Sequence, residues 1–281
     1  LNSPACQHTP YYHTLSTPIR YANDDPLEKW LFDAFCLASE PKDFDATIAL
    51  TGPIKFEHLS QEALSNDSVL LQQVFGLLIQ AHYQTRPSDL RDILDAHSFR
   101  TYALFGKCSK QTKILLSVCL VSMEGPILNR HKEDTIQEDI LNGFRRPKGH
   151  LIPQVLCHHM AIKEALNLSG ARVVRIATLP NLQNQNLASK LLQGVINTLK
   201  EEEVDYIGSS FASTPDVSQF WAKNAFKTIR IGNKQDGASG THSALVFKGL
   251  TNSGLEIEGS AFNIHTRNQQ LIDSRQELTS I

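Results

Sequence analysis

The stretch from Arg172 to Lys200 constrains the fold of this chain more than any other. It opens with a short apolar run at 173–177, which predicts a buried strand. A tight turn follows at Leu179-Pro180-Asn181. Apolar residues then recur on one helical face: Leu187, Leu191, Leu192, Val195, Ile196 and Leu199. The stretch therefore predicts a strand, a loop and a long helix in direct succession.

The loop of this unit is polar, with the run Gln183-Asn-Gln-Asn186 just before the helix and the small residues Ala188 and Ser189 just inside it. A helix leaves its first four N–H groups unpaired, and its dipole places partial positive charge there. The arrangement is typical of a phosphate-binding loop. An ordinary strand–helix connection has the same pattern, and the loop by itself does not separate the two.

Composition limits the classes of function that this chain can have. The 281 residues are 41% hydrophobic and 20% charged, as in a protein with a packed core. The net charge is −2 and the isoelectric point is near 6.6, so bulk charge attracts no nucleic acid. Any contact with RNA must therefore come from a local basic patch.

The cysteines and the hydropathy pattern point to the cytoplasm. The five cysteines are scattered with no pair at metal-ligand spacing, so we expect reduced thiols and no metal site; they are Cys6, Cys36, Cys108, Cys119 and Cys157. No apolar run reaches the length of a membrane span, and we expect no signal peptide. We therefore expect a cytoplasmic protein that has no membrane partner.

The order of elements predicts the fold class. Strands are expected at 54–59, 101–105, 114–122, 204–211, 226–231 and 243–248, besides the central one. Helices are expected at 26–35, 69–83, 88–94, 151–168 and from 216, besides the central one. Ser88 is expected to cap one helix, and Asp216-Val-Ser-Gln219 reads as a capping box for another. The prediction is an α/β fold, a mixed sheet flanked by helices.

The same pattern divides the chain into three parts. Residues 1–50 are expected to be a lead-in from a missing upstream module, with a possible short strand or loop at 43–51. Residues 51–250 are expected to form the domain, with a loop-rich insertion near the site at 124–149 and a hairpin gap at 106–111. Residues 251–281 are expected to start a polar tail, weakly helical near Leu271.

The central unit and the element order resemble the GNAT superfamily of acetyl-CoA-dependent N-acetyltransferases. The superfamily's loop pattern is Gln/Arg-x-x-Gly-x-Gly/Ala, and Gln183-x-x-Asn186-x-Ala188 follows it with Asn at the first glycine position. Asn tolerates a left-handed backbone better than most residues. Gln219-Phe-Trp-Ala-Lys-Asn-Ala-Phe226 is similar to the second motif, with Ala225 in place of glycine. The resemblance implies a GNAT-like fold and acetyl-CoA as cofactor.

Several collinear segments resemble, more closely, the bacterial tRNA(Met) cytidine acetyltransferase family. They are Pro18–Tyr21 with Asp25–Trp30, Ala81–Leu90, Phe144–Leu151, Arg175–Thr178, and Arg230–Asn233 with Ala238–Gly240. The family forms N4-acetylcytidine at the wobble position of elongator tRNA(Met), using acetyl-CoA and hydrolysing ATP or GTP. The chain lacks the phosphate-loop pattern Gly-x-x-x-x-Gly-Lys-Ser/Thr, so ATP or GTP is expected only in a missing upstream module. Leu179 stands where the family usually has His.

The resemblance also implies which residues hold the cofactor. They are Ile176, Ala177 and Thr178 as strand backbone, Gln183, Asn184, Gln185, Asn186, Leu187, Ala188 and Ser189 as loop amides, and Asp216 and Lys223. A plain helix cap explains Asp216 as well as cofactor binding does. A position on a solvated helix face is the alternative interpretation of Lys223.

The chemistry requires a general base, because the lone pair of a cytidine amine is delocalised into the ring. The candidates are His150, His158, His159, Asp205 and His242, and none stands out. The candidate RNA-binding residues are Arg145, Arg146 and Lys148, the densest basic cluster, which also reads as solvated surface.

Two other functions stay open at this stage. One is a GNAT acetyltransferase that acts on a protein or small-molecule amine. The other is a non-catalytic module that binds acetyl-CoA or RNA, because Asn186 and Leu179 depart from the family pattern.

Overall fold

The computed structural model describes residues 13, 19–37, 39, 52–80, 87–107, 113–128, 135–235, 237 and 240–279. The chain divides into two compact units, Leu1–Ser39 and Glu40–Ile281. In the first unit, α1 (Pro26–Ala34) begins as predicted, with Pro26 in its first turn and the Asp25 carboxylate accepting a hydrogen bond from Leu27 N at 2.8 Å.

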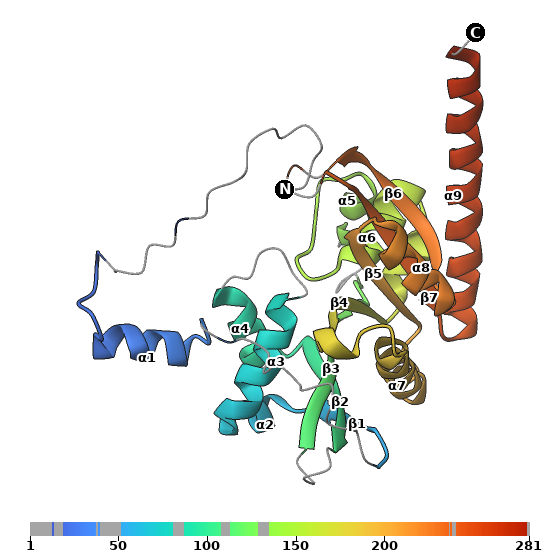
Figure 1. Cartoon of the computed structure of the whole chain (residues 1–281). Coiled ribbons are helices and arrows are strands. Elements are labelled where there is room, and N and C mark those ends of the chain that lie inside the picture. Colours follow the sequence, from blue (N-terminus) through green and yellow to red (C-terminus); the bar gives the residue numbers. More distant parts are fainter. Residues whose placement is uncertain are drawn as a thin grey trace. The chain divides into compact units, whose positions relative to one another are not determined.

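The described residues of the second unit form a mixed seven-stranded sheet (Figure 1). Its strands are β1 (Lys55–Leu59), β2 (Phe99–Lys107), β3 (Lys113–Glu124), β4 (Gly170–Thr178), β5 (Tyr206–Ala212), β6 (Lys227–Gln235) and β7 (His242–Gly249). Their order is β1-β2-β3-β4-β5-β7-β6. Neighbours are antiparallel except β4 and β5, which are parallel. The predicted α/β mixed sheet is confirmed.

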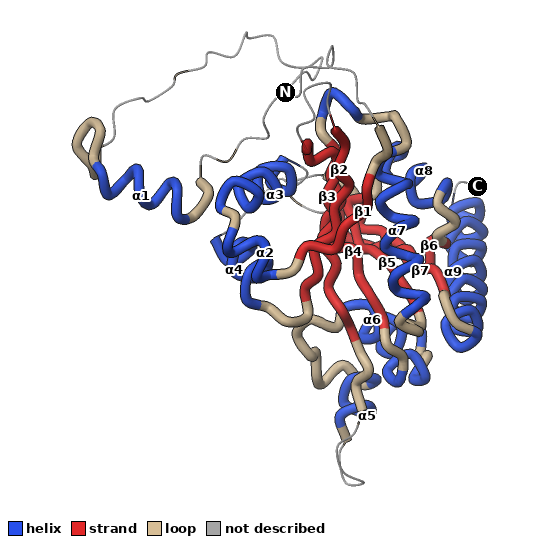
Figure 2. The backbone as a smooth tube through the Cα atoms, turned by 90° about the horizontal axis from the view of Figure 1, so that it is seen from below, coloured by secondary structure: helices blue, strands red, loops and turns tan. Residues whose placement is uncertain are grey.

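Helices cover both faces of this sheet. In Figure 2, α2 (Gln61–Asn66), α3 (Ser68–Gln80) and α4 (Pro87–Asp95) lie on one side of β1–β4, and α7 (Leu187–Glu201) lies on the other. The remaining elements are α5 (Ile136–Leu141), α6 (Leu151–Met160), η1 (Lys163–Asn167), η2 (Pro180–Leu182), α8 (Pro215–Lys223) and α9 (Asn252–Thr279). One core cluster joins α6, η1 and α9 to β5, β6 and β7 through side chains that include Leu156, Tyr206, Ile229, Phe247 and Ile257.

The sheet opens at its centre. β4 and β5 pair only over Gly170–Val173 and Tyr206–Ser209, although β4 continues to Thr178 and β5 to Ala212. The register between β3 and β4 also shifts, because Leu120 is opposite Arg175 and Val121 is opposite Val173. Val174 is therefore a β-bulge. Beyond Val173, β4 has no backbone partner on the β5 side among the residues that the structure describes, and the two strands diverge.

The expected helix over 151–168 is wrong in one respect, since α6 ends at Met160 and η1 follows it. Ala161 adopts a left-handed backbone, with φ 56°. Because the helix breaks here, the Ile162 side chain packs in one core cluster and the Leu166 side chain packs in another. Burial of these two side chains outweighs the continuous helical pattern.

Both predicted serine and aspartate caps are wrong, because proline sets the start of each helix. α8 begins at Pro215 and its N-cap is Thr214, whose Oγ1 accepts from Val217 N at 3.4 Å. The capping box predicted at Asp216 therefore does not form, and Asp216 lies in the first turn. α4 likewise begins at Pro87, so Ser88 is its second residue. Proline is well suited to the first helical position.

Three short or terminal segments differ from the expected picture. α2 and α5 are six-residue helices that were not predicted, and they are too short to show a clear period. The weakly helical tail is one long helix, α9, whose first turns pack on the sheet through Ile257 and Ala261. No helix among the described residues is long and apolar enough to span a membrane.

Some expectations fall outside the described residues. They include Cys6, Cys108, the possible strand at 43–51, the end of the helix expected at 69–83 and most of the hairpin gap at 106–111. The other cysteines, Cys36, Cys119 and Cys157, are free and buried. Burial raises the pKa of the Cys119 thiol well above its usual range, which keeps it protonated.

Candidate functional site

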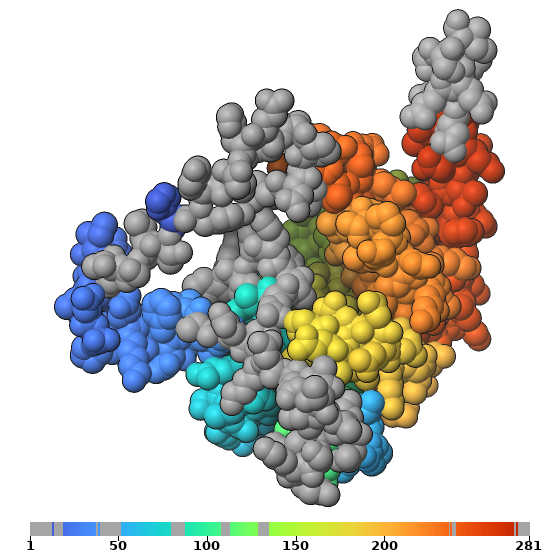
Figure 3. Space-filling model, in the orientation of Figure 1, coloured from blue at the N-terminus to red at the C-terminus, as the bar shows by residue number. Residues whose placement is uncertain are grey.

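A cleft of about 1430 Å³ lies where β4 and β5 diverge. Its walls come from β4, β5, α3, α8 and the loop that leads into α7. In the space-filling view of Figure 3, the yellow residues around position 180 lie beside the orange residues of α8, and both segments line this cleft. The part of β4 after Val173, which pairs with β3 but not with β5, thus forms the floor of a large pocket.

The N-terminus of α7 opens into the cleft. Asn186 is its N-cap, with φ 63° and ψ 13°, and makes no side-chain capping hydrogen bond. The first intrahelical bond runs from Lys190 N to Asn186 O at 3.0 Å. The N–H groups of Leu187, Ala188 and Ser189 therefore have no acceptor within the helix, and the helix dipole adds positive potential there. The predicted tolerance of Asn186 for a left-handed backbone is confirmed, and the end of the helix suits an anion.

Residues at the end of α8 hold this loop. Asn224 Nδ2 donates to Ser189 Oγ at 3.1 Å, and Lys223 Nζ donates to Asn186 Oδ1 at 3.4 Å. Ala225 follows in a left-handed conformation, with φ 61°, and turns the chain so that Phe226 packs edge-on against Trp221. The exposed Lys223 ammonium adds a full positive charge beside the open helix end.

The end of the floor is fixed by a hydroxyl network. Ser117 Oγ on β3 donates to Ala177 O at 2.6 Å and lies 2.9 Å from Thr178 Oγ1. Gln183 Nε2 also donates to Thr178 O, at 3.5 Å. These contacts hold the last residues of β4 in an extended form, with the edge towards β5 left open.

All but one of the residues that the sequence analysis predicts to bind the cofactor line this cleft. Gln185 is not among the residues that line the cleft. The predicted residues that do line it are Ile176, Ala177, Thr178, Gln183, Asn184, Asn186, Leu187, Ala188, Ser189, Asp216 and Lys223. They come from β4, the loop, α7 and α8, so segments up to 47 positions apart in the sequence, from Ile176 to Lys223, share one site.

None of the five candidate bases is among the described residues that line the cleft. Three of the histidines make backbone hydrogen bonds through Nδ1. His150 Nδ1 accepts from Gly125 N at 2.7 Å, His158 Nδ1 lies 3.0 Å from Leu141 O, and His242 Nδ1 lies 2.7 Å from Gly232 O.

The other two candidates lie in different surroundings. Asp205 accepts hydrogen bonds from Ser169 N at 2.9 Å and Thr251 Oγ1 at 2.7 Å, which ties the start of β5 to the start of α9. His159 is exposed on α6. Its pKa is lowered, first by partial burial and then by the positive charges of Arg230, His158 and Arg146.

The basic cluster Arg145, Arg146 and Lys148 lies outside the cleft, on the exposed loop before α6. Arg145 lines a second hollow of about 210 Å³; the other residues around it are Pro126, Ile127, Leu128, Ile136, Pro147 and His150. Phe144 beside it is 83% exposed. This loop contacts the end of β3 rather than the open end of β4, since His150 bonds to Gly125.

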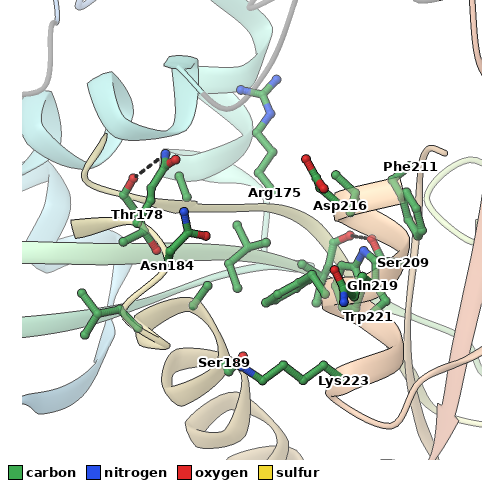
Figure 4. Close-up of a pocket in the computed structure, with 18 of the residues that line it drawn as sticks. Arg175, Thr178, Asn184, Ser189, Ser209, Phe211, Asp216, Gln219, Trp221 and Lys223 are labelled. Carbon is green, nitrogen blue, oxygen red and sulfur yellow. Dashed lines mark hydrogen bonds between the residues drawn. The ribbon is translucent and has the colours of Figure 1, made fainter. Parts of the chain in front are cut away.

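Sequence reasoning gave no separate role to Arg175, which lines the cleft as well. Its Nη2 donates to Asp89 Oδ2 on α4 at 2.6 Å, and its side chain is 7% exposed. In Figure 4, Arg175 extends from β4 away from Ser189 and Lys223, which lie across the strand from it. A charged residue within an apolar run was the signal that could have found it.

Comparison with protein families gives two matches. Residues 73–199 and 185–251 match the family described as GNAT acetyltransferase 2. Residues 5–38 match the family described as RNA cytidine acetyltransferase NAT10/TcmA, helicase domain.

The curated relatives include proteins named tRNA(Met) cytidine acetyltransferase. The chain is 36% identical over 268 residues to the tRNA(Met) cytidine acetyltransferase TmcA of Nitrosococcus halophilus, covering 94% of the chain and 34% of that protein. It is 33% identical over 250 residues to the protein of the same name from Pyrococcus furiosus, covering 86% of the chain and 29% of that protein. The chain thus spans about a third of the length of these relatives.

Among solved structures, FeeM, an N-acyl amino acid synthase from uncultured soil microbes, superposes with a TM-score of 0.47. It is 16% identical, with 72% of this chain and 94% of that chain covered.

Proposed function

Since the chain belongs to the GNAT acetyltransferase 2 family, we propose that it is the acetyltransferase portion of an enzyme that forms N4-acetylcytidine at the wobble position of elongator tRNA(Met) from acetyl-CoA. The observation that carries the proposal is the open N-terminus of α7 beside the unpaired edge of β4. The relatives named tRNA(Met) cytidine acetyltransferase support the choice of substrate. Hydrolysis of ATP or GTP is assigned to another module.

The residues of the cleft fit acetyl-CoA. The free N–H groups at the start of α7 and the Lys223 ammonium suit the pyrophosphate, which carries negative charge. The unpaired edge of β4 after Val173 offers backbone donors and acceptors in a row. The pantetheine arm is extended and contains two amides, so it can pair with this edge as an added strand would.

The chain supplies positioning and polarity to the reaction. The thioester of acetyl-CoA is an activated acyl group, so holding it next to the acceptor amine provides a large part of the acceleration. A backbone N–H on the open edge of β4 polarises the thioester carbonyl as negative charge develops on its oxygen. The diverging strands leave room for the amine to approach the carbonyl carbon from the face opposite the open end of α7.

RNA is proposed to meet the exposed loop at Arg145, Arg146 and Lys148. Two guanidinium groups can each bind a phosphate through two parallel hydrogen bonds. Partial burial is the first cause that lowers the pKa of His159, and Arg230 and Arg146 also lie close enough to contribute, so basic side chains extend onto the neighbouring surface of α6. Because the net charge of the chain is −2, such a local patch is required for RNA binding.

The cofactor placement is tested by replacing Ala188 in the first turn of α7. Ala188→Glu puts bulk and negative charge where the pyrophosphate is proposed to bind, so we expect acetyl-CoA binding to be lost in calorimetry. Ala188→Gln separates bulk from charge and should weaken binding less. Asn197→Glu, on the exposed face further along α7, is the matched control and should leave the affinity unchanged. Unchanged affinity in Ala188→Glu would rule out this placement.

The substrate is tested by turnover. Purified protein is given acetyl-CoA with a tRNA(Met) transcript, or with spermidine and a peptide amine instead, and the products are identified by mass spectrometry. The proposal predicts acetylation of cytidine in the transcript alone. Acetylation of the free amines alone would contradict it.

A further inference from the structure

Arg175 has a buried hydrogen-bond donor without an acceptor. Its side chain is 7% exposed and its Nη2 is paired with Asp89 at 2.6 Å, but its Nη1 has no hydrogen-bond partner among the described residues. Buried donors on charged groups are almost always satisfied, because leaving one unpaired is costly. The free N–H therefore points to an acceptor supplied by a ligand.

The β-bulge decides where this guanidinium points. Without the bulge, Val173 and Arg175 would share a face of the sheet, because side chains alternate along a strand. With Val174 as the extra residue, Arg175 is opposite Leu120 and Val173 is opposite Val121, so the two side chains lie on different faces. Arg175 thereby reaches Asp89 on α4, across β4 from Ser189 and Lys223 (Figure 4).

This position matches the side from which the acceptor must come. The inference rests on the proposed function, in which acetyl-CoA lies against the start of α7 and against α8. The acceptor amine then approaches across β4, from the side of α3 and α4, where Leu77 and Arg175 line the same cleft. Arg175 is thus within the cleft but away from the phosphates of the cofactor.

The charge balance selects the kind of atom that Nη1 would bind. The Asp89 carboxylate already compensates the guanidinium, so a further full negative charge such as a phosphate is not required. An uncharged carbonyl oxygen suits a single buried N–H. Cytosine presents its amine, N3 and the O2 carbonyl along one edge.

We propose that Arg175 Nη1 donates a hydrogen bond to O2 of the acceptor cytosine, while Asp89 holds the guanidinium in place. Arg175 would then be a specificity-determining residue. Adenine also has an exocyclic amine, but a C–H group stands where cytosine has O2, so an adenine in the same position would leave Nη1 unpaired. Sites built around such a buried donor reject ligands that lack the acceptor.

The experiment compares cytidine with 2-thiocytidine, in which a sulfur atom, a weak acceptor, replaces O2. Each nucleoside is titrated into the chain saturated with CoA, and binding is followed by NMR chemical shifts. We expect the wild-type chain to bind cytidine about tenfold more tightly, as for the loss of one hydrogen bond to a charged group. Arg175→Met should bind the two nucleosides with equal affinity.

Two further variants separate this role from a structural one. Arg175→Met/Asp89→Asn removes both charges of the pair, so it replaces the single variant if loss of the Arg175–Asp89 ion pair unfolds the chain. Arg100→Met, which breaks the ion pair with Glu202 on the surface, is the matched control and should keep the tenfold preference. Equal wild-type affinities, no binding of cytidine, or a preference that persists in Arg175→Met would overturn the inference. Failure of the wild-type chain to bind CoA would instead overturn the proposed function.

Discussion

Lys223 at the end of α8 donates from Nζ to Asn186 Oδ1, at 3.4 Å, at the residue where α7 begins. The contact places a full positive charge beside a helix end that already carries partial positive charge. In the absence of an anion, these two charges repel each other. The side chain amide of Asn186 lies between them and offers only a weak neutral acceptor. This arrangement is favourable when a negative group occupies the loop.

Lys223→Met should weaken acetyl-CoA binding several-fold, because the variant keeps the length of the stem and loses the charge. The effect is modest because the ammonium is exposed and partly screened. The measurement is calorimetry at two salt concentrations, and the variant should also show a weaker dependence on salt. Lys200→Met, at the far end of α7, is the control. Equal acetyl-CoA affinities of wild type and Lys223→Met at low salt would show that Lys223 does not contribute to acetyl-CoA binding.

The central unit could be predicted from sequence because each of its signals is local. An apolar strand, a polar loop and a four-residue periodicity follow one another from Val173 to Leu199, and tertiary packing reinforces all three. The cofactor residues could be placed because loop and helix are contiguous. Asp216 and Lys223 required the resemblance as well, since α8 reaches the loop only through the fold.

The parts that sequence reasoning missed depend on contacts between distant segments. The break at Ala161 exists because Ile162 and Leu166 pack into separate clusters, which no window of the sequence reveals. The orientation of Arg175 depends on a bulge, and a bulge is a property of the pairing between β3 and β4. The loop at 143–150 was expected near the site, but its placement depends on the bond from Gly125 N to His150.

Ala225→Gly should stabilise the fold. Ala225 has φ 61°, a conformation that costs an L-residue roughly 1–2 kcal/mol. Glycine removes this strain but has more freedom in the unfolded chain, so the expected net gain is about 0.5–1 kcal/mol. The free energy of unfolding is measured by urea denaturation. Asn186→Gly should gain less, because Asn adopts φ 63° more readily. A larger gain at Asn186 than at Ala225 would contradict this explanation.

Glu124→Gln should destabilise the fold by about 3 kcal/mol, the range for breaking one side of a buried ion pair. The Glu124 side chain is fully buried, where it accepts from Arg172 Nε at 2.5 Å and from Ile152 N at 2.8 Å. It thereby joins the end of β3 to the starts of β4 and α6. In Glu124→Gln, the side-chain NH2 group would face either the Arg172 guanidinium or Ile152 N, and both of these are donors. Glu138→Gln is the control. It breaks an exposed pair with Lys163 and should cost much less, because solvent screens the two charges. Similar losses in the two variants would show that burial does not decide the effect.

Arg145→Ala/Arg146→Ala should weaken tRNA binding and flatten its dependence on salt. Both side chains are exposed, and neither has an ion-pair partner among the described residues, so both are available to phosphates. Each phosphate contact that is lost should reduce the log–log slope of affinity against salt by roughly 0.7–0.9. The measurement is a salt titration of tRNA binding for wild type and variant.

Acetyl-CoA affinity separates this prediction from a general loss of folding. The loop contacts the end of β3, and neither Arg145 nor Arg146 lines the large cleft, so calorimetry with acetyl-CoA should give the wild-type value. Arg91→Ala/Lys200→Ala removes the same charge from two other exposed positions and should leave the slope nearly unchanged. An equal change of slope in both double variants would mean that net charge, rather than this loop, governs RNA binding. Loss of acetyl-CoA binding in Arg145→Ala/Arg146→Ala would instead place the loop in the cofactor site.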